Sequence, residues 1–258
     1  MKIYIHTDLE GISGIDSAEM IEKINPRYEY CIKRLMIDVN AAISGAFAGG
    51  ASCVTVLDSH GGGGNFDVDL LDKRADLDIK ENKKWWGKLD NSYCGTFFIG
   101  AHAMAGTMNA FLDHTQSSTS WYNYRVNGRK MGELAQWAIV AANFNVPMLM
   151  MSGDEAACVE ARQFFNPIEC ACVKRGIGRN KAQLFNNDNA VSDIYEAAKK
   201  AMSLIGQAKP FKPILPMEII LELYRSDFCD AKANKPGVER LDARTVRKIA
   251  SNYLDLLL

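Results

Sequence analysis

Five side chains that can bind a metal ion or move a proton stand at the ends of short apolar runs. A close acidic pair, Asp8 and Glu10, ends the first run, and His60, His102 and His114 each end a later one. Imidazole and carboxylate bind zinc and similar divalent ions, and strand ends are where an α/β fold gathers residues that are distant in sequence. The pattern predicts a metal site, and a metal-dependent hydrolase is the leading interpretation.

Asp8 and Glu10 have a spacing that, in extended chain, puts both carboxylates on the same side. Each candidate alone has an ordinary explanation, such as a histidine in the core or a glutamate that stabilises a helix N-terminus. Their joint placement favours a binuclear site, in which two ions about 3.5–4 Å apart polarise a carbonyl or phosphoryl oxygen and hold a hydroxide nucleophile. The predicted ligands are Asp8, Glu10, His60, His102 and Glu133.

The elements that must position these residues follow from the periodicity of the apolar side chains. Short apolar runs predict strands at residues 2–7, 53–57, 96–100 and 146–151. Helical spacing predicts helices at residues 30–48, 132–142, 155–164 and 193–205. Residues 122–126, followed by the turn pair Asn127-Gly128, predict a hairpin. The β-α-β rhythm implies an α/β fold with a mostly parallel central sheet flanked by helices.

The best candidate boundary is a short segment that contains Pro210, Pro213 and Pro216. It divides the chain into a catalytic α/β domain, residues 1–209, and a small C-terminal α+β segment, residues 210–258. In that segment we expect a strand at residues 217–223, a polar loop that ends at Pro236-Gly237, and a terminal helix from Ala243. The segment completes the fold or forms a subunit contact.

The composition restricts the partners. Thirty basic and thirty-one acidic side chains leave a formal net charge of −1, so no broad field attracts nucleic acid or a membrane surface. The seven cysteines are odd in number and scattered through apolar stretches, which is typical of reduced, mostly buried thiols. Cys170 and Cys172 form a C-x-C pair that alternation along a strand explains as well as a metal role does. With no apolar run long enough to span a bilayer, we expect a cytoplasmic protein.

Two further motifs have more than one interpretation. The glycine run 61–64 lacks the following Lys-Ser or Lys-Thr of a phosphate loop and fits no dinucleotide fingerprint, so a loop that lets backbone approach the site is expected. Trp85-Trp86, among several lysines, could stack a ligand or belong to a surface helix that packs on a neighbouring segment or subunit.

Residues 7–14, T-D-L-E-G-I-S-G, resemble the D-x-E-G-I-S-G opening of the DppA-type zinc D-aminopeptidases. Further blocks follow in family order. Residues 58–61 with Asn65 resemble the N-D-S-H segment of the family, and residues 100–107 resemble its G-Y-H-A-R-A-G-T segment. Residues 113–115 resemble the segment with the downstream histidine, and residues 127–134 resemble the G-E-L segment. The resemblance covers roughly residues 1 to 175.

This resemblance implies a binuclear zinc aminopeptidase that releases N-terminal residues, D-alanyl residues above all, from short peptides or amides. It implies that the five predicted ligands hold two zinc ions and that His114 is the catalytic residue. His114 could act as nucleophile or as base toward water. Manganese and cobalt accept the same ligand types. It also implies a homo-oligomer, in the family a ring.

Two departures from the family pattern bear on substrate preference. Met104 stands where the family commonly has arginine, and His6 takes the place of a usual serine. By strand parity His6 could face the metal side, and we expect a core residue or a partner of a ligand rather than a ligand. The competing functions are a phosphoesterase or deacylase of small molecules that uses the same metals, and a non-enzymatic metal-bearing binding protein.

Overall fold

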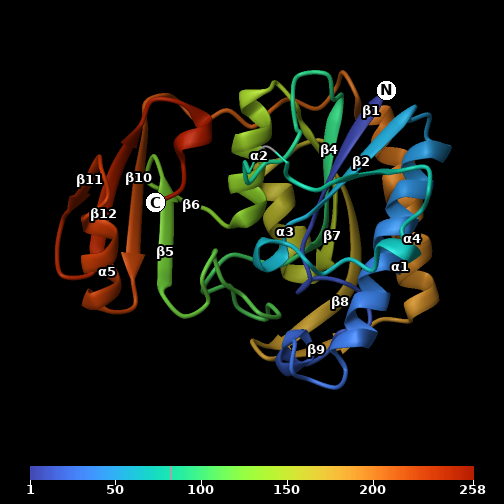
Figure 1. Cartoon of the computed structure of the whole chain (residues 1–258), viewed down its shortest axis with the longest axis horizontal. Coiled ribbons are helices and arrows are strands. Elements are labelled where there is room, and N and C mark those ends of the chain that lie inside the picture. The colour runs from blue at the N-terminus through green and yellow to red at the C-terminus, as the bar shows by residue number, and fades with distance from the viewer. Residues whose placement is uncertain (82) are drawn as a thin grey trace.

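The computed structural model describes residues 1–81 and 83–258. Its main body is a seven-stranded sheet in the order β3 (Asp76–Asp78), β2 (Cys53–Asp58), β1 (Lys2–Thr7), β4 (Gly95–Ala101), β7 (Met148–Asp154), β8 (Glu169–Gly178) and β9 (Lys181–Leu184) (Figure 1). Neighbouring strands are parallel except β9, which runs antiparallel to β8. The expected mostly parallel sheet is confirmed.

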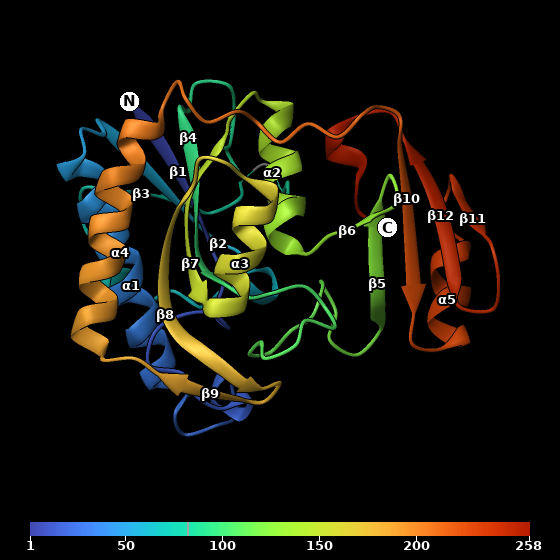
Figure 2. The same ribbon diagram turned by 180° about the vertical axis from the view of Figure 1, so that it is seen from behind.

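Helices cover both faces of this sheet. α1 (Tyr28–Ala48) and α4 (Asn187–Ala201) pack together on one face, and α2 (Glu133–Asn143) and α3 (Glu155–Phe164) lie on the other (Figure 2). In β1, Ile3 and Ile5 join the core with α1 and α4, whereas Tyr4 joins the core with α2 and α3. Because successive strand residues point to opposite faces, a strand that is apolar on both needs a helix layer on each.

A second sheet stands beside α2 at one side of the molecule (Figure 1). It has the order β11 (Val238–Arg240), β12 (Thr245–Ala250), β10 (Met217–Leu223), β5 (Trp121–Val126) and β6 (Arg129–Lys130), with all pairs antiparallel. α5 (Ser226–Ala233) packs against β10, β11 and β12. The predicted hairpin at Asn127-Gly128 is confirmed, and its two strands extend a sheet whose other strands come from the C-terminal segment.

Two expectations for the C-terminal segment were wrong. The predicted terminal helix from Ala243 is instead the strand β12, and the predicted polar loop before Pro236 contains α5. β12 forms a local hairpin with β11 and pairs along its other edge with the more distant β10, and these backbone hydrogen bonds outweigh the helical preference of the sequence. Residues 85–88, which include Trp85 and Trp86, form turns and not a helix.

The remaining short elements connect the layers. Single-turn 3-10 helices cover Ala18–Ile21, His60–Gly62, Val68–Leu70, Met202–Leu204 and Tyr253–Asp255. Cys170 and Cys172 lie on β8, as strand alternation predicts, and all seven cysteines are free thiols. Within the described ranges, no helix combines the length and the apolar character needed to cross a bilayer.

Gly11 marks the closest approach between the loop after β1 and the end of β4. Its backbone N–H donates to the carbonyl of Gly100 at 2.8 Å. A Cβ atom at this position would lie 1.9 Å from the carbonyl oxygen of Ala101, a distance that no side chain tolerates. The glycine of the D-x-E-G motif is therefore required by backbone packing beneath the acidic pair.

We predict that Gly11→Ala lowers the free energy of unfolding by at least about 2 kcal/mol, because the methyl group forces the loop away from β4. Urea unfolding followed by circular dichroism measures the change. Gly178→Ala is the matched control, since nothing lies within 4 Å of a Cβ atom there, and it should stay within about 0.5 kcal/mol of the parent. Equal stabilities of the two variants would contradict the packing argument.

Candidate metal centre

Three neighbouring strands end at the same level of the central sheet. Thr7, at the end of β1, is opposite Asp58 of β2 on one side and Ile99 of β4 on the other. Because the strands are parallel, the residues that follow them meet at one edge of the sheet. This register brings together Asp8, Glu10, His60 and His102.

The first group of side chains that could hold a metal ion is formed by Asp8, Glu10 and His60. His60 Nδ1 lies 2.9 Å from Asp8 Oδ1 and 3.0 Å from Glu10 Oε2. Both carboxylates are buried, whereas the imidazole of His60 is partly exposed. One nitrogen thus faces both carboxylates, although Asp8 and Glu10 lie in the loop that bends and turns after β1 and not in the extended chain that their spacing suggested.

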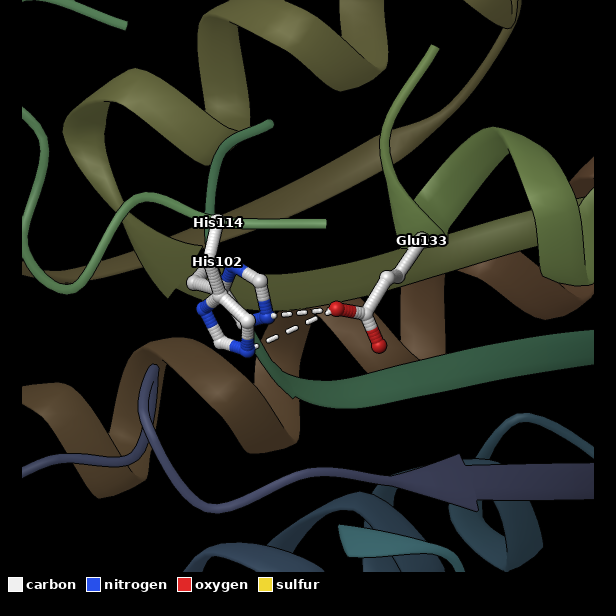
Figure 3. Close-up of side chains that lie close together, drawn as sticks. All are labelled: His102, His114 and Glu133. Carbon is white, nitrogen blue, oxygen red and sulfur yellow. Dashed lines mark ion pairs between the residues drawn. The ribbon is translucent and has the colours of Figure 1, made fainter. Parts of the chain in front are cut away.

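The second group is formed by His102, His114 and Glu133 (Figure 3). Glu133 Oε1 lies 3.3 Å from His102 Nε2 and 3.6 Å from His114 Nε2. The two imidazoles stack with ring centroids 4.0 Å apart. Glu133 is the first residue of α2, and it also accepts a hydrogen bond from the backbone N–H of Gln116 at 2.7 Å.

The two groups fit a pair of divalent cations. Within each group, one ligand atom from every residue lies within 4.8 Å of the others. Asp8 faces both groups, because its Oδ2 lies 3.4 Å from His102 Nε2 while its Oδ1 contacts His60. Nε2 of His102 is buried and has no hydrogen-bond partner in the described part of the chain. A buried, unpaired imidazole nitrogen among carboxylates is the donor arrangement that zinc uses.

The pKa values of the clustered side chains show that this site favours positive charge. Burial lowers the pKa of His60, but Glu10 and Asp8 outweigh it and raise that pKa to about 11. Burial also lowers the pKa of His102, but Asp8 and Glu133 outweigh it and raise that pKa well above its ordinary value. Burial raises the pKa of Glu10, and the nearby histidines, His60 first, reverse this and lower it. The imidazoles beside Glu10 therefore favour its ionised form.

Two histidines have their tautomers set by backbone carbonyls. His114 Nδ1 donates to the carbonyl of Leu112 at 2.7 Å, and His102 Nδ1 donates to the carbonyl of Ala103 at 3.0 Å. In each ring the neutral form then carries its lone pair on Nε2, the atom that faces the acidic cluster. His114 Nε2 is thus available for chemistry.

Lys174 supports the metal-binding loop from inside the protein, although it lies far away in sequence on β8. Its ammonium is fully buried and donates to the carbonyls of Glu10 at 2.6 Å, Ile12 at 2.9 Å and Ile15 at 3.1 Å. Burial lowers the pKa of Lys174 to about 8. One cation thus binds three carbonyls of the loop that carries the acidic pair.

Polar side chains fix the other loops of the site. Ser13 donates through its N–H and hydroxyl to the buried carboxylate of Asp38, at 2.7 and 2.6 Å. Asn65 donates to the carbonyl of His60 at 2.7 Å and to Asp58 at 2.9 Å, which closes the glycine loop. Gly61 to Gly64 all have positive φ, a backbone that glycine adopts without strain. Loop geometry therefore accounts for Ser13, Asn65 and the glycine run 61–64 of the sequence motifs.

A cavity of about 420 Å³ lies against the cluster. His6 lines it and stacks on Trp137 with ring centroids 4.2 Å apart, and burial lowers the pKa of His6 to about 3. Among the described residues, His6 belongs to neither of the two groups that could hold a metal ion. Met104, the other departure, does not line this cavity.

Sequence reasoning missed several residues of this cavity, namely Lys80, Gln116, Gln136 and Trp137. A signal existed for two of them, because Gln136 and Trp137 lie three and four residues after Glu133 and therefore on the same face of the predicted helix. No local signal identified Lys80 or Lys174. Their positions depend on loops and strands that meet only in the folded chain.

The whole chain, residues 1–258, matches the D-aminopeptidase family Peptidase_M55. A D-aminopeptidase of Bacillus subtilis strain 168 is 31% identical over 261 aligned residues, which cover 99% of this chain and 93% of that protein. A solved structure of the Zn-dependent D-aminopeptidase DppA from Bacillus subtilis, a self-compartmentalizing protease, matches with a TM-score of 0.93 at 28% identity, over 99% of this chain and 94% of that one.

The fold, the acidic histidine cluster and these similarities define the protein as a metal-dependent aminopeptidase. The chain belongs to the D-aminopeptidase family Peptidase_M55. The resemblance read from residues 7–14 and the blocks that follow is thereby confirmed, and the match extends over the C-terminal segment as well.

We predict that Lys174→Met lowers the free energy of unfolding by about 2 kcal/mol or more, because three buried carbonyls lose their donor. The zinc content of the purified protein should fall with it, since the loop that carries Glu10 loosens. Lys181→Met, at an exposed position on the neighbouring β9, is the control and should change neither quantity. Urea unfolding and elemental analysis decide, and an unaltered zinc content in Lys174→Met would contradict the supporting role.

Proposed function

We propose that this aminopeptidase binds two zinc ions per chain through Asp8, Glu10, His60, His102 and Glu133. The single observation that carries the proposal is the convergence of these side chains in two groups, with Asp8 facing both. When bound, the zinc ions supply Lewis-acid chemistry that polarises an amide carbonyl and lowers the pKa of water. The Bacillus subtilis relative of similar structure is itself Zn-dependent.

His114 is the proposed catalytic residue. Its Nδ1–H bond to Leu112 orients the ring, and its Nε2 lies 3.8 Å from Glu10 Oε1 and 3.6 Å from Glu133 Oε1, at the cavity wall. As a base, the Nε2 lone pair takes a proton from an attacking water, and the protonated ring then passes that proton to the departing amine. As a nucleophile, Nε2 forms an acyl bond to the carbonyl carbon while the amine departs with a proton from water, and a second water then hydrolyses the acyl bond. Both routes use the same atom.

The proposed substrates are short peptides or amides with an N-terminal D-amino acid, the class that the family name indicates. A cavity of about 420 Å³ admits a small peptide and not a folded chain. We further propose a cytoplasmic homo-oligomer, supported by seven free thiols and by the self-compartmentalizing relative. Residues 210–258, as a segment that completes the second sheet, are the proposed site of a subunit contact.

We predict about two zinc ions per chain after zinc loading and dialysis, and fewer than one in Asp8→Ala, because Asp8 faces both groups. Elemental analysis of the purified proteins gives the stoichiometry and names the metal. Asp69→Ala, at an exposed position, is the matched control and should keep the full content. One ion in the parent protein, or two in Asp8→Ala, would overturn the binuclear assignment.

We predict that His114→Ala lowers kcat for D-alanyl-D-alanine hydrolysis by about 10²-fold or more while both zinc ions stay bound. Release of D-alanine, measured beside the zinc content, tests both parts. Loss of one zinc ion would make His114 a ligand, because it lies within ligand distance of His102 and Glu133.

The same substrate panel separates the competing functions. Turnover of phosphoesters above that of peptides by the zinc-loaded protein would favour a phosphoesterase. No turnover of D- or L-aminoacyl peptides or amides by protein with two bound zinc ions would leave a binding protein.

A further inference from the structure

The cavity beside the metal centre contains polar side chains that the proposed hydrolysis does not use. Two of them are buried and have an atom without a hydrogen-bond partner among the described residues: Nδ1 of His6 and Nε2 of Gln136. The two side chains are 8% and 1% exposed. An unpaired buried polar atom costs about 1–3 kcal/mol, so its retention at a cavity wall indicates a ligand that completes the bond.

The unpaired amide of Gln136 is a donor, and Nδ1 of His6 can be one. Gln136 Oε1 accepts a hydrogen bond from Gln116 Nε2 at 2.9 Å, which leaves the NH₂ group of Gln136 as its free end. In one of its tautomers His6 carries a proton on Nδ1, and that tautomer supplies a second donor. These groups require an acceptor oxygen and would repel an ammonium group.

Lys80 adds a positive charge to the same cavity. It is the only lysine or arginine that lines the cavity in the described ranges, and its Nζ donates to a single carbonyl, that of Gly62, at 3.3 Å. An ammonium group has three donors, so two remain for a ligand. Charge-assisted hydrogen bonds of this kind are stronger than neutral ones, and carboxylate is their usual partner in a peptide.

The spacing between Gln136 and Glu133 suits a dipeptide. Glu133, Gln136 and Trp137 share one face of α2, so the metal-binding carboxylate and the donor lie about one helical turn apart. In a dipeptide the free carboxylate is separated from the scissile amide nitrogen by a single Cα atom. Trp85 and Trp137 supply apolar surface for the part in between.

We propose that Lys80, Gln136 and His6 form a subsite for the free C-terminal carboxylate of a dipeptide, so that the enzyme selects dipeptides by their leaving group. The proposal rests on the proposed aminopeptidase function. The carboxylate belongs to the departing amino acid, and its recognition orients the scissile carbonyl toward the metal-binding cluster.

The test compares D-alanyl-D-alanine with its C-terminal amide, in which a neutral NH₂ group of similar size replaces one oxygen of the charged carboxylate. The zinc-loaded parent protein should favour the acid about tenfold or more in kcat/KM, as a charge-assisted hydrogen bond predicts. In Lys80→Met this preference should fall toward unity, and Lys80→Arg should restore most of it. Lys73→Met is the matched control, because Lys73 also donates to one carbonyl, that of Val68 at 3.3 Å, outside the cavity.

A binding measurement separates failure of the subsite from failure of the function. Calorimetric titration of the metal-free protein should show tighter binding of the acid than of the amide, and Lys80→Met should lose the difference. Hydrolysis of both substrates at equal rates by the parent protein would overturn the subsite and leave the aminopeptidase intact. Hydrolysis of neither substrate would overturn the aminopeptidase function, and the titration would then test the subsite by itself. Equal binding of the acid and the amide would overturn the subsite as well.

Discussion

Three carboxylates, those of Asp8, Glu10 and Glu133, converge at one edge of the central sheet, the first two buried and the third partly buried, and their need for nearby positive charge is the constraint on which the site depends. Ionised groups removed from water must be compensated by nearby positive charge. In the metal-free chain His60 and His102 supply it, with pKa values raised by the same carboxylates. In the zinc-loaded enzyme that we propose, metal ions take over this role from protons.

The fold holds these repelling groups in place by backbone geometry. Three parallel strands end level, Gly11 allows the loop after β1 to lie against the end of β4, and Lys174 binds the carbonyls of the same loop. The second sheet packs beside α2, the helix that begins with Glu133 and carries the cavity residues Gln136 and Trp137. A rigid scaffold on both sides is what a site built from loops requires.

The cavity combines two electrostatic environments. One part is lined by the acidic cluster with its histidines, and the other by His6 and Trp137, whose rings stack. His6 lies two residues before Asp8 in the sequence, yet burial keeps it neutral while His60 is held as a cation. The family assignment explains the acidic part. The aromatic stacking in the other part depends on His6, which stands where the family usually has serine.

The sequence by itself determined the fold class, most strands and helices, the family and the residues of the cluster, because apolar periodicity and motif spacing are local properties. Tertiary structure alone decided the rest. Residues 245–250 became β12 and not a helix because the distant strand β10 offered an edge for pairing beside the adjacent β11. Lys174 reached the loop of Glu10, and Gln136 kept a free amide at the cavity, through contacts between segments distant in sequence. Such contacts follow from packing, which no local pattern encodes.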